Sequence, residues 1–310
     1  MQLGLAVDLG NRFVKVAGGA VPTDFWLYES VYAFGAGPGS LYYVNGSRQD
    51  WVGKTWVVGA AARHYRRPIP TWSGEKADAA LPLVLGAVGT LAGLEKVELD
   101  LAMSLPYGES NALEQQLLGT HELVCAGGRK LKVVIDSVRV EPEGMGIYRY
   151  GASQVQGGLT GVLDLGGGTA IALLVDEHGK QIESARVVLR RGGVYGLAAD
   201  IASDPRLQAQ VVGTPKIELI MNGIADNSCR YGAQGATFAR FFEERLELWM
   251  KGILGELLNR WDPWLDEVGV VLVAGGGAPL AARVLGENSW FRVLDNPQFA
   301  QVLGLRGVLG

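Results

Sequence analysis

The chain has 310 residues, more than one hydrophobic core usually organises, so two lobes are expected. Hydrophobic residues make up 48% of the sequence and charged residues 19%, a balance that excludes an intrinsically disordered chain. The formal net charge of −4 gives no bulk reason to expect direct binding to nucleic acid.

Cysteine usage and the N-terminus indicate the compartment. Cys125 and Cys229 are too few and too far apart for a disulfide framework or a zinc site. The chain starts with the alternating run 3–8, which lacks the basic start and continuous apolar stretch of a signal peptide. No uninterrupted apolar segment is long enough to span a bilayer. We therefore expect a cytoplasmic protein that does not associate with a membrane.

Hydrophobic periodicity and turn residues predict the elements of the first half of the chain. These are strands at 3–9 and 12–18, aromatic-rich strands within 25–73, a helix at about 77–92, a strand at 98–104, a helix at 111–119 and a strand meander over 121–141.

The second half is predicted in the same way. It is expected to hold a strand–turn–strand unit at 160–176, a strand at 182–189, a helix at about 194–202, a polar irregular stretch at 203–234, a helix from Phe238 to Trp261, a strand at 268–274 and helices at about 279–286 and 298–306. The helix that ends at Trp261 is the clearest, because its apolar residues recur at steps of three and four.

Two hairpins carry residues suited to phosphate binding. The first offers Asp8, Gly10, Asn11 and Lys15. The second repeats the aspartate at Asp164 and adds three glycines and a hydroxyl, in the order Gly166, Gly167, Gly168, Thr169. Glycine lets a phosphate approach the backbone closely, and backbone N–H groups, hydroxyls and cations supply the donors. Each hairpin alone is also compatible with an ordinary β-turn.

A third glycine turn follows the strand at 268–274. Gly275, Gly276 and Gly277 lie between this strand and a helix, where a ribose or base is able to approach the backbone. A tight strand-to-helix connection is the alternative interpretation. The sequences Val7–Gly10 and Leu163–Gly166 echo one another, so two similar halves that enclose a ligand are expected.

Together and in this order, the three motifs resemble those of the actin/Hsp70/sugar-kinase superfamily. Within it, the chain looks most like the bacterial and archaeal actin-like ATPases of the ParM/StbA plasmid-segregation type. Three further segments carry that resemblance, at 105–107, 118–123 and 296–304. The resemblance spans nearly the whole chain and implies an α/β actin-like fold, with two RNase H-like lobes around a nucleotide cleft and a smaller subdomain in each lobe.

The resemblance also implies domain limits. Lobe I would cover 1–144, with a small subdomain at about 20–75. Lobe II would cover 145–310, with a small subdomain at about 192–265 and the last helix packing on lobe I.

Site roles follow from the same resemblance. Asp8 and Asp164 would hold Mg²⁺ through water, and Asp164 would also position water. Glu143 would orient or activate the attacking water, because hydrolysis needs an in-line nucleophile. The phosphates and nucleoside of ATP or ADP would contact Asp8, Gly10, Asn11, Lys15, Gly166, Gly167, Gly168, Thr169, Gly193, Gly275, Gly276 and Gly277. Lys216 and Glu218 are candidates for the adenine pocket, and GTP stays open as the nucleotide.

The function implied is a polymerising ATPase that forms head-to-tail filaments and segregates plasmid or other DNA through a separate DNA-binding adaptor. Two alternatives share the fold. A small-molecule kinase would need an acceptor pocket with its own base, and no such second group of residues is visible. A non-polymerising ATPase of the Hsp70, pilus-assembly or cell-division type would be expected to carry a peptide-binding domain or a membrane helix.

Overall fold

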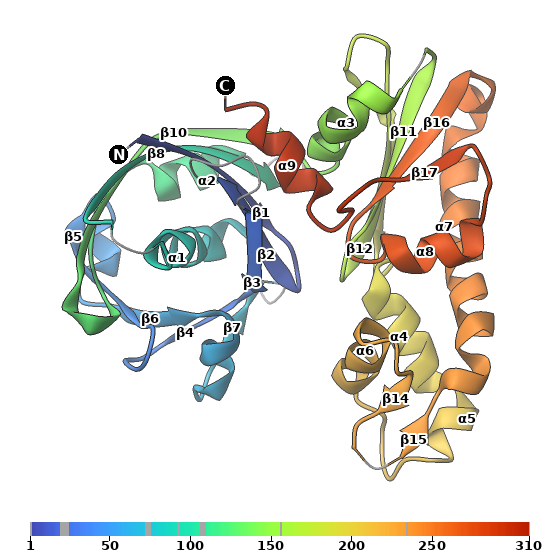
Figure 1. The fold of residues 1–310 in the computed structure, drawn as a ribbon, viewed down its shortest axis with the longest axis horizontal. Helices are drawn as coiled ribbons and strands as arrows, with labels where there is room; N and C mark the ends of the chain where they lie inside the picture. The colour runs from blue at the N-terminus through green and yellow to red at the C-terminus, as the bar shows by residue number, and fades with distance from the viewer. Residues whose placement is uncertain are drawn as a thin grey trace. The chain divides into compact units, whose positions relative to one another are not determined.

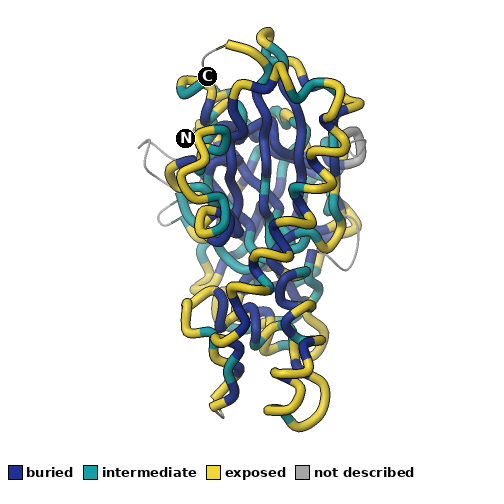
Figure 2. The backbone as a smooth tube through the Cα atoms, turned by 90° about the vertical axis from the view of Figure 1, so that its right-hand side faces the viewer, coloured by how far each residue is buried: buried dark blue, intermediate teal, exposed yellow. Residues whose placement is uncertain are grey.

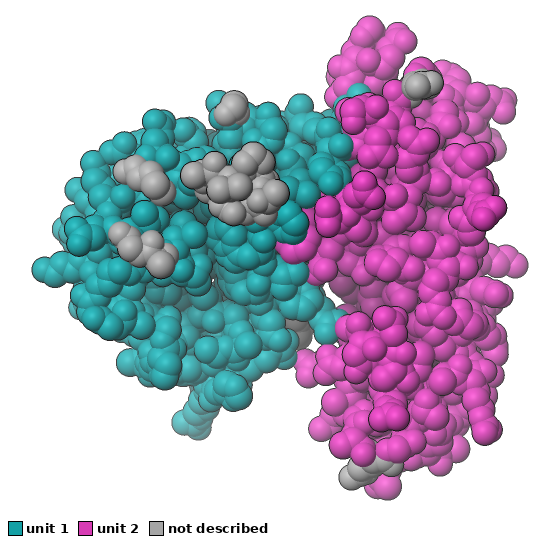
Figure 3. All heavy atoms as spheres, in the orientation of Figure 1, with its two compact units in different colours: residues 1–150, 301–310 teal, residues 151–300 magenta. Residues whose placement is uncertain are grey.

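The computed structural model of the protein describes residues 2–18, 25–71, 76–91, 94–105, 110–155, 157–233 and 235–309, without the side chains of 110–112. The chain divides into two units, residues 1–150 with 301–310 and residues 151–300 (Figure 3). Pro106 and Tyr107 of the 105–107 segment lie outside the described residues. The predicted lobe limits and small subdomains stay predictions.

A ten-stranded sheet forms the frame of the first unit. Its order is β3 (Phe25–Glu29), β2 (Phe13–Gly18), β1 (Gln2–Leu9), β8 (Lys96–Leu105), β10 (Lys130–Pro142), β9 (Gly119–Cys125), β5 (Leu41–Gly46), β6 (Thr55–Val58), β4 (Val31–Phe34) and β7 (Ile69–Pro70). β1, β8 and β10 run parallel, and β2 and β3 continue the sheet antiparallel. The aromatic-rich strands of 25–70 therefore extend this sheet at both of its ends.

The sheet curves around one helix, α1 (Lys76–Gly89) (Figure 1). Apart from Asp78, every residue from Ala77 to Val88 is buried. A helix that is apolar all round requires burial on every side, and the curved sheet supplies it. Trp56 on β6 donates its indole N–H to the carbonyl of Pro82 at 3.1 Å, which fixes the helix against the strands.

Two short helices, one after β10 and one starting at residue 300, pack closely against each other. α3 (Met145–Gly151) and α9 (Ala300–Arg306) approach so closely that a Cβ on Gly304 would lie 1.7 Å from the carbonyl oxygen of Gly146. The Gln301 side-chain oxygen accepts bonds from the N–H groups of Gly144 and Ile147, each at 3.2 Å. Residues from the end of the chain therefore satisfy N–H groups at the start of α3, which would otherwise be unpaired.

The second unit contains a five-stranded sheet. Its order is β13 (Gln181–Arg190), β12 (Thr169–Val175), β11 (Leu159–Leu165), β16 (Val268–Ala274) and β17 (Phe291–Val293). β11, β12 and β13 are antiparallel neighbours, and β16 and β17 run parallel to β11. In the sheet of the first unit, the five neighbouring strands β3, β2, β1, β8 and β10 have the same order along the chain and the same relative directions as these five strands. The sequence echo between the halves therefore reflects a repeated strand arrangement.

Helices cover this second sheet and extend beyond it. They are α4 (Val194–Ser203), α5 (Pro205–Gln208), α6 (Ile217–Ala225), α7 (Phe242–Trp261) and α8 (Ala278–Leu285), with a short ribbon of β14 (Arg230–Tyr231) and β15 (Ala236–Thr237). Trp261 of α7 donates its indole N–H to Ala185 at 2.8 Å, and Trp249 donates to Gly192 at 2.9 Å. In Figure 2 the strands are dark blue, whereas the loops and outer helix turns are yellow.

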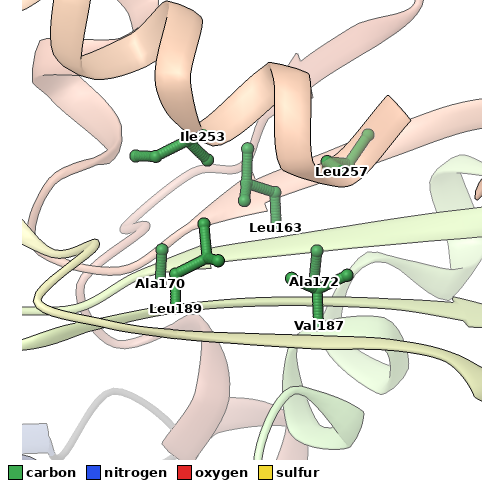
Figure 4. Close-up of a pocket in the computed structure, with 7 residues that line it drawn as sticks. All are labelled: Leu163, Ala170, Ala172, Val187, Leu189, Ile253 and Leu257. Atoms are coloured by element: carbon green, nitrogen blue, oxygen red, sulfur yellow. The ribbon is translucent and has the colours of Figure 1, made fainter. Parts of the chain in front are cut away.

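A gap remains in this packing, between the sheet and α7 (Figure 4). It is too narrow to admit a water molecule, and only apolar side chains line it: Leu163, Ala170, Ala172, Val187, Leu189, Ile253 and Leu257. The gap is therefore a seam in the core and offers nothing that would bind a charged ligand.

The sequence predicted most elements within a few residues of their observed limits. The prediction of an irregular stretch at 203–234 was wrong, because this segment contains α5, α6 and β14. Ile217, Ile220, Met221 and Ile224 show the helical spacing that should have revealed α6. Helix α7 begins at Phe242, later than predicted, because Phe238 and Phe241 are buried in the turn that precedes it. Helix α3 and strand β17 were not predicted.

Candidate functional site

In the first unit, the carboxylate of Asp8 is the centre of a polar cluster. Asp8 is buried near the end of β1, where the register sets it opposite Lys15 on β2 and Ser104 on β8. Lys15 Nζ lies 2.7 Å from one carboxylate oxygen, and the Ser104 hydroxyl donates to the other at 3.1 Å. Burial favours the protonated form, but the charges of Lys15 and Lys76 and both hydrogen bonds outweigh it. The net pKa of Asp8 lies below its usual range, so the group is ionised at neutral pH.

Gly10 begins the turn after β1. A Cβ at this position would lie 2.7 Å from the carbonyl oxygen of Phe13 and 2.9 Å from Lys15 Nζ. The turn therefore has room for a glycine beside the lysine, but little for a larger residue. Asn11 follows in the bend and is half-buried.

Glu143 lies where β10 leads into α3, and it is 8% exposed. Its backbone N–H donates to the carbonyl of Leu105 at 3.2 Å, at the end of the neighbouring strand β8. Its side chain forms an ion pair with Lys76, the first residue of α1. The charge of Lys76 also lowers the pKa of Asp8, against the opposing effect of burial. Lys76 therefore links Glu143 to the polar cluster around Asp8.

Two members of this cluster, Lys76 and Ser104, were missed by sequence reasoning. Ser104 had a usable signal in the sequence, since it is a polar residue in the apolar stretch Leu101–Leu105. The structure buries it fully. Lys76 had no such signal, because its partner Glu143 is distant in the sequence.

In the second unit, the glycine loop after β11 is held by the start of α4. The N–H of Gly166 donates to the carbonyl of Thr169 at 2.9 Å and closes the turn. The N–H groups of Val194 and Tyr195 donate to the carbonyls of Gly166 and Gly167 at 3.1 and 2.8 Å. Four of the predicted residues, from Gly166 to Thr169, thus lie against the N-terminus of α4.

Gly193 has a packing role at this contact. A Cβ there would lie 2.4 Å from the carbonyl oxygen of Gly166 and 2.8 Å from the backbone nitrogen of Thr169. Glycine is therefore needed for α4 to approach the loop, whatever the loop binds.

The third glycine turn packs against Asp164 and Leu165, the two residues that precede the same loop. Gly275 has φ +89°, and a Cβ on it would lie 2.4 Å from Oδ1 of Asp164. The N–H of Gly277 donates to the carbonyl of Leu165 at 2.8 Å. A Cβ on Gly276 would have no atom within 4 Å, so its surface is open. The second unit thus brings Asp164, the loop 166–169, Gly193 and the turn 275–277 together.

The equivalent aspartates of the two units differ in their surroundings. In the register of β11, Asp164 is opposite Ile171 and Ala274, where Asp8 has Lys15 and Ser104. Asp164 is also more exposed than Asp8. Lys216 and Glu218 are exposed at the start of α6, and their role in an adenine pocket stays a prediction.

Within the described residues, no group of three or more His, Cys, Asp or Glu side chains is placed to hold a metal ion. A Mg²⁺ ion commonly has only one or two protein carboxylates, with waters and phosphate oxygens completing its shell. The carboxylate groups of the ionised Asp8 and the half-buried Asp164 are chemically suited to be such Mg²⁺ ligands. Among the same residues, no helix combines the length and apolar character needed to cross a membrane.

Comparison with known proteins places this geometry in a class. Residues 6–146 match the family model described as the N-terminal domain of actin-like proteins. No curated protein sequence matches the chain. Three solved structures are similar over nearly all of it. Ta0583, an archaeal actin homolog in complex with ADP, is 17% identical, with 99% of this chain and 98% of that chain covered and a TM-score of 0.80. A 15-stranded ParM filament from Clostridium botulinum is 13% identical (99% of each chain covered, TM-score 0.78), and the actin-like protein Alp7A is 15% identical (100% of this chain and 96% of that chain covered, TM-score 0.77).

The chain therefore has the actin-like fold, as the sequence motifs predicted. The resemblance to actin-like proteins is confirmed over residues 6–146 by the family model and over the whole chain by the fold. At these identities, the structural likeness shows the fold alone, and function has to be argued from the site.

Proposed function

We propose that this protein is a polymerising actin-like ATPase that binds and hydrolyses Mg-ATP. The observation that carries the proposal is the repeated strand arrangement, in which Asp8 and Asp164 occupy the same position in the first strand of each unit. Each aspartate is followed by a tight glycine-containing turn, and such turns are suited to phosphate. The ADP complex of the archaeal actin homolog supports a nucleotide as the ligand.

The residues have distinct proposed tasks. Lys15, Asn11, Thr169 and the backbone of Gly10 and Gly166–Gly168 would bind phosphates, and Gly193 would support them by packing. Gly275, Gly276 and Gly277 would contact the nucleoside. Asp8 and Asp164 would hold Mg²⁺ through water, and the ion would supply charge neutralisation on the phosphate oxygens.

Glu143 is the proposed group that orients or activates the attacking water, with Asp164 also positioning water. The carboxylate of Glu143 is buried and held by an ion pair, which suits a residue that must present an oxygen in a fixed direction. Phosphoryl transfer depends chiefly on positioning and electrostatics, so a few well-held side chains are sufficient.

Filament formation is the second part of the proposal. A ParM protein of the same fold is known as a 15-stranded filament, and this supports self-association of the present chain. A repeated head-to-tail contact generates an open filament rather than a closed ring. We propose that such filaments act in plasmid or DNA segregation in the cytoplasm, through a separate DNA-binding adaptor.

Asp164→Asn tests the site in the second unit. The variant removes the carboxylate charge and keeps the shape, so phosphate release from Mg-ATP should fall at least about 100-fold, the range expected for a lost electrostatic contact. Asp266→Asn is the matched control, because it makes the same change at an exposed residue of the same unit. Unchanged phosphate release in Asp164→Asn would refute the site. A strictly monomeric protein whose turnover rises with a sugar would instead favour a small-molecule kinase.

A further inference from the structure

Lys76 lies in an electrostatically unfavourable place for a lysine. It is the first residue of the 14-residue helix α1, whose N-terminus carries partial positive charge. A cation there is disfavoured by the helix itself, so the position must be explained by groups outside the helix.

Those groups are carboxylates. Lys76 forms an ion pair with Glu143, and the side chains of the two residues are only 15% and 10% exposed. The charge of Lys76 also acts on Asp8, whose own partner is Lys15. Among the described residues, two lysines and two carboxylates thus form a largely buried cluster. Removal of one partner from such a cluster leaves an uncompensated charge.

The pair joins distant parts of the unit. Lys76 starts α1, whereas Glu143 lies 67 positions further along, at the end of β10. Lys15 and Asp8, by contrast, are cross-strand neighbours in one hairpin. The orientation of the Glu143 side chain therefore depends on where the first turn of α1 lies.

We propose that Lys76 is a positioning residue, which holds the carboxylate of Glu143 in the orientation that directs an attacking water. This inference rests on the proposed ATPase function and extends it, since it assigns a role to a residue outside the three glycine motifs. Lys76 acts through Glu143 and does not touch the reacting atoms. Its loss should lower turnover and leave nucleotide affinity almost unchanged.

The test compares single-turnover phosphate release and the Kd of a fluorescent ADP analogue in the wild type and three single variants. Lys76→Met should slow phosphate release about tenfold or more, with Kd within about threefold of the wild type, as expected when a nearby group loses its orientation. Lys76→Arg keeps the charge and should retain most of the turnover. Lys96→Met breaks the exposed pair Lys96–Glu98 of the same unit and should change neither value.

Combining variants distinguishes positioning from a general structural role. In the Glu143→Gln background, Lys76→Met should cause no further loss of turnover, because the group that it positions is already disabled. A further tenfold loss in the double variant, or an equal loss of ADP affinity, would overturn the inference. Wild-type turnover in Lys76→Met would also overturn it. If Lys76→Met fails to fold by circular dichroism, Lys76→Gln is subject to the same comparison.

The proposed function and this inference fail in different ways. A wild-type protein that hydrolyses no ATP refutes the proposed function, and the inference with it. A wild-type protein that hydrolyses ATP, with Lys76→Met equally active, refutes the inference alone.

Discussion

Gly275 offers a sharp test of the geometry in the second unit, because two separate effects oppose any side chain there. Its φ of +89° lies in the region that L residues rarely adopt. A Cβ would also lie 2.4 Å from Oδ1 of Asp164 and 2.5 Å from the carbonyl oxygen of Leu165. That carbonyl is fixed, since it accepts the N–H of Gly277 at 2.8 Å. Gly275→Ala should therefore strain the backbone and displace the Asp164 carboxylate.

The size of the effect follows from these two terms. A left-handed backbone costs a non-glycine residue about 1–2 kcal/mol. Overpacking a tight contact adds about 1–3 kcal/mol. Their sum is about 2–5 kcal/mol, and each kcal/mol corresponds to roughly 2–4 °C in melting temperature for a unit of this size. The displaced Asp164 should also slow phosphate release.

Two other glycines of the same unit serve as controls. Gly286 has φ +59° and ψ −140° with no atom near its Cβ position, so Gly286→Ala isolates a backbone term of about 1–3 kcal/mol. Gly276 is open, and Gly276→Ala should change stability by less than about 0.5 kcal/mol. Since Gly276 is a predicted nucleoside contact, its variant should still weaken nucleotide binding.

The assay is thermal unfolding of the three variants, followed by phosphate release. The expected order of stability is Gly276→Ala, then Gly286→Ala, then Gly275→Ala as the least stable. A Gly275→Ala protein as stable as Gly286→Ala would refute the close contact between Gly275 and Asp164.

Two further predictions concern the first unit. His121 is buried between Tyr43 Oη and the Leu117 carbonyl, each at 2.8 Å, and burial lowers its pKa below 6.5. As pH falls below 6.5, the unfolded chain binds a proton at His121 that the folded chain does not, so the folded state loses stability. The urea midpoints of unfolding at pH 7 and pH 5 should therefore differ more in the wild type than in His121→Phe. An equal difference in the two proteins would contradict this prediction. Gln301→Ala leaves two N–H groups at the start of α3 without their acceptor, so it should lower the free energy of unfolding, measured by thermal unfolding, by about 1–3 kcal/mol. The control Gln49→Ala, at an exposed residue, should lower it by less than about 1 kcal/mol. Equal losses of stability in the two variants would contradict the capping role of Gln301.

Local patterns in the sequence predicted the parts of the fold that depend on near neighbours. The hairpins that contain Asp8 and Asp164 are tight turns between adjacent strands, so apolar runs and glycines were sufficient to locate them. Helix α7 was found from its periodicity. The order of the motifs then predicted the actin-like fold, which the comparisons confirm.

Long-range pairing accounts for most of what was missed. Ser104 reaches Asp8 only because β8 lies parallel to β1 in one register, and Lys76 reaches Glu143 only because α1 is enclosed by the curved sheet. Neither arrangement is encoded in a short window of sequence. Helix α6 is a different case, since its spacing was visible and polar neighbours concealed it. The site residues themselves stay predictions until a variant is measured.

The most direct test of the central claim is assembly of the wild-type protein with Mg-ATP, followed by sedimentation and electron microscopy. Parallel samples would contain Mg-ADP or no nucleotide, and phosphate release would be recorded on the same material. The proposed function predicts filaments that pellet with Mg-ATP, together with phosphate release. A protein that stays monomeric with Mg-ATP at every concentration tested would contradict the proposal of a polymerising ATPase.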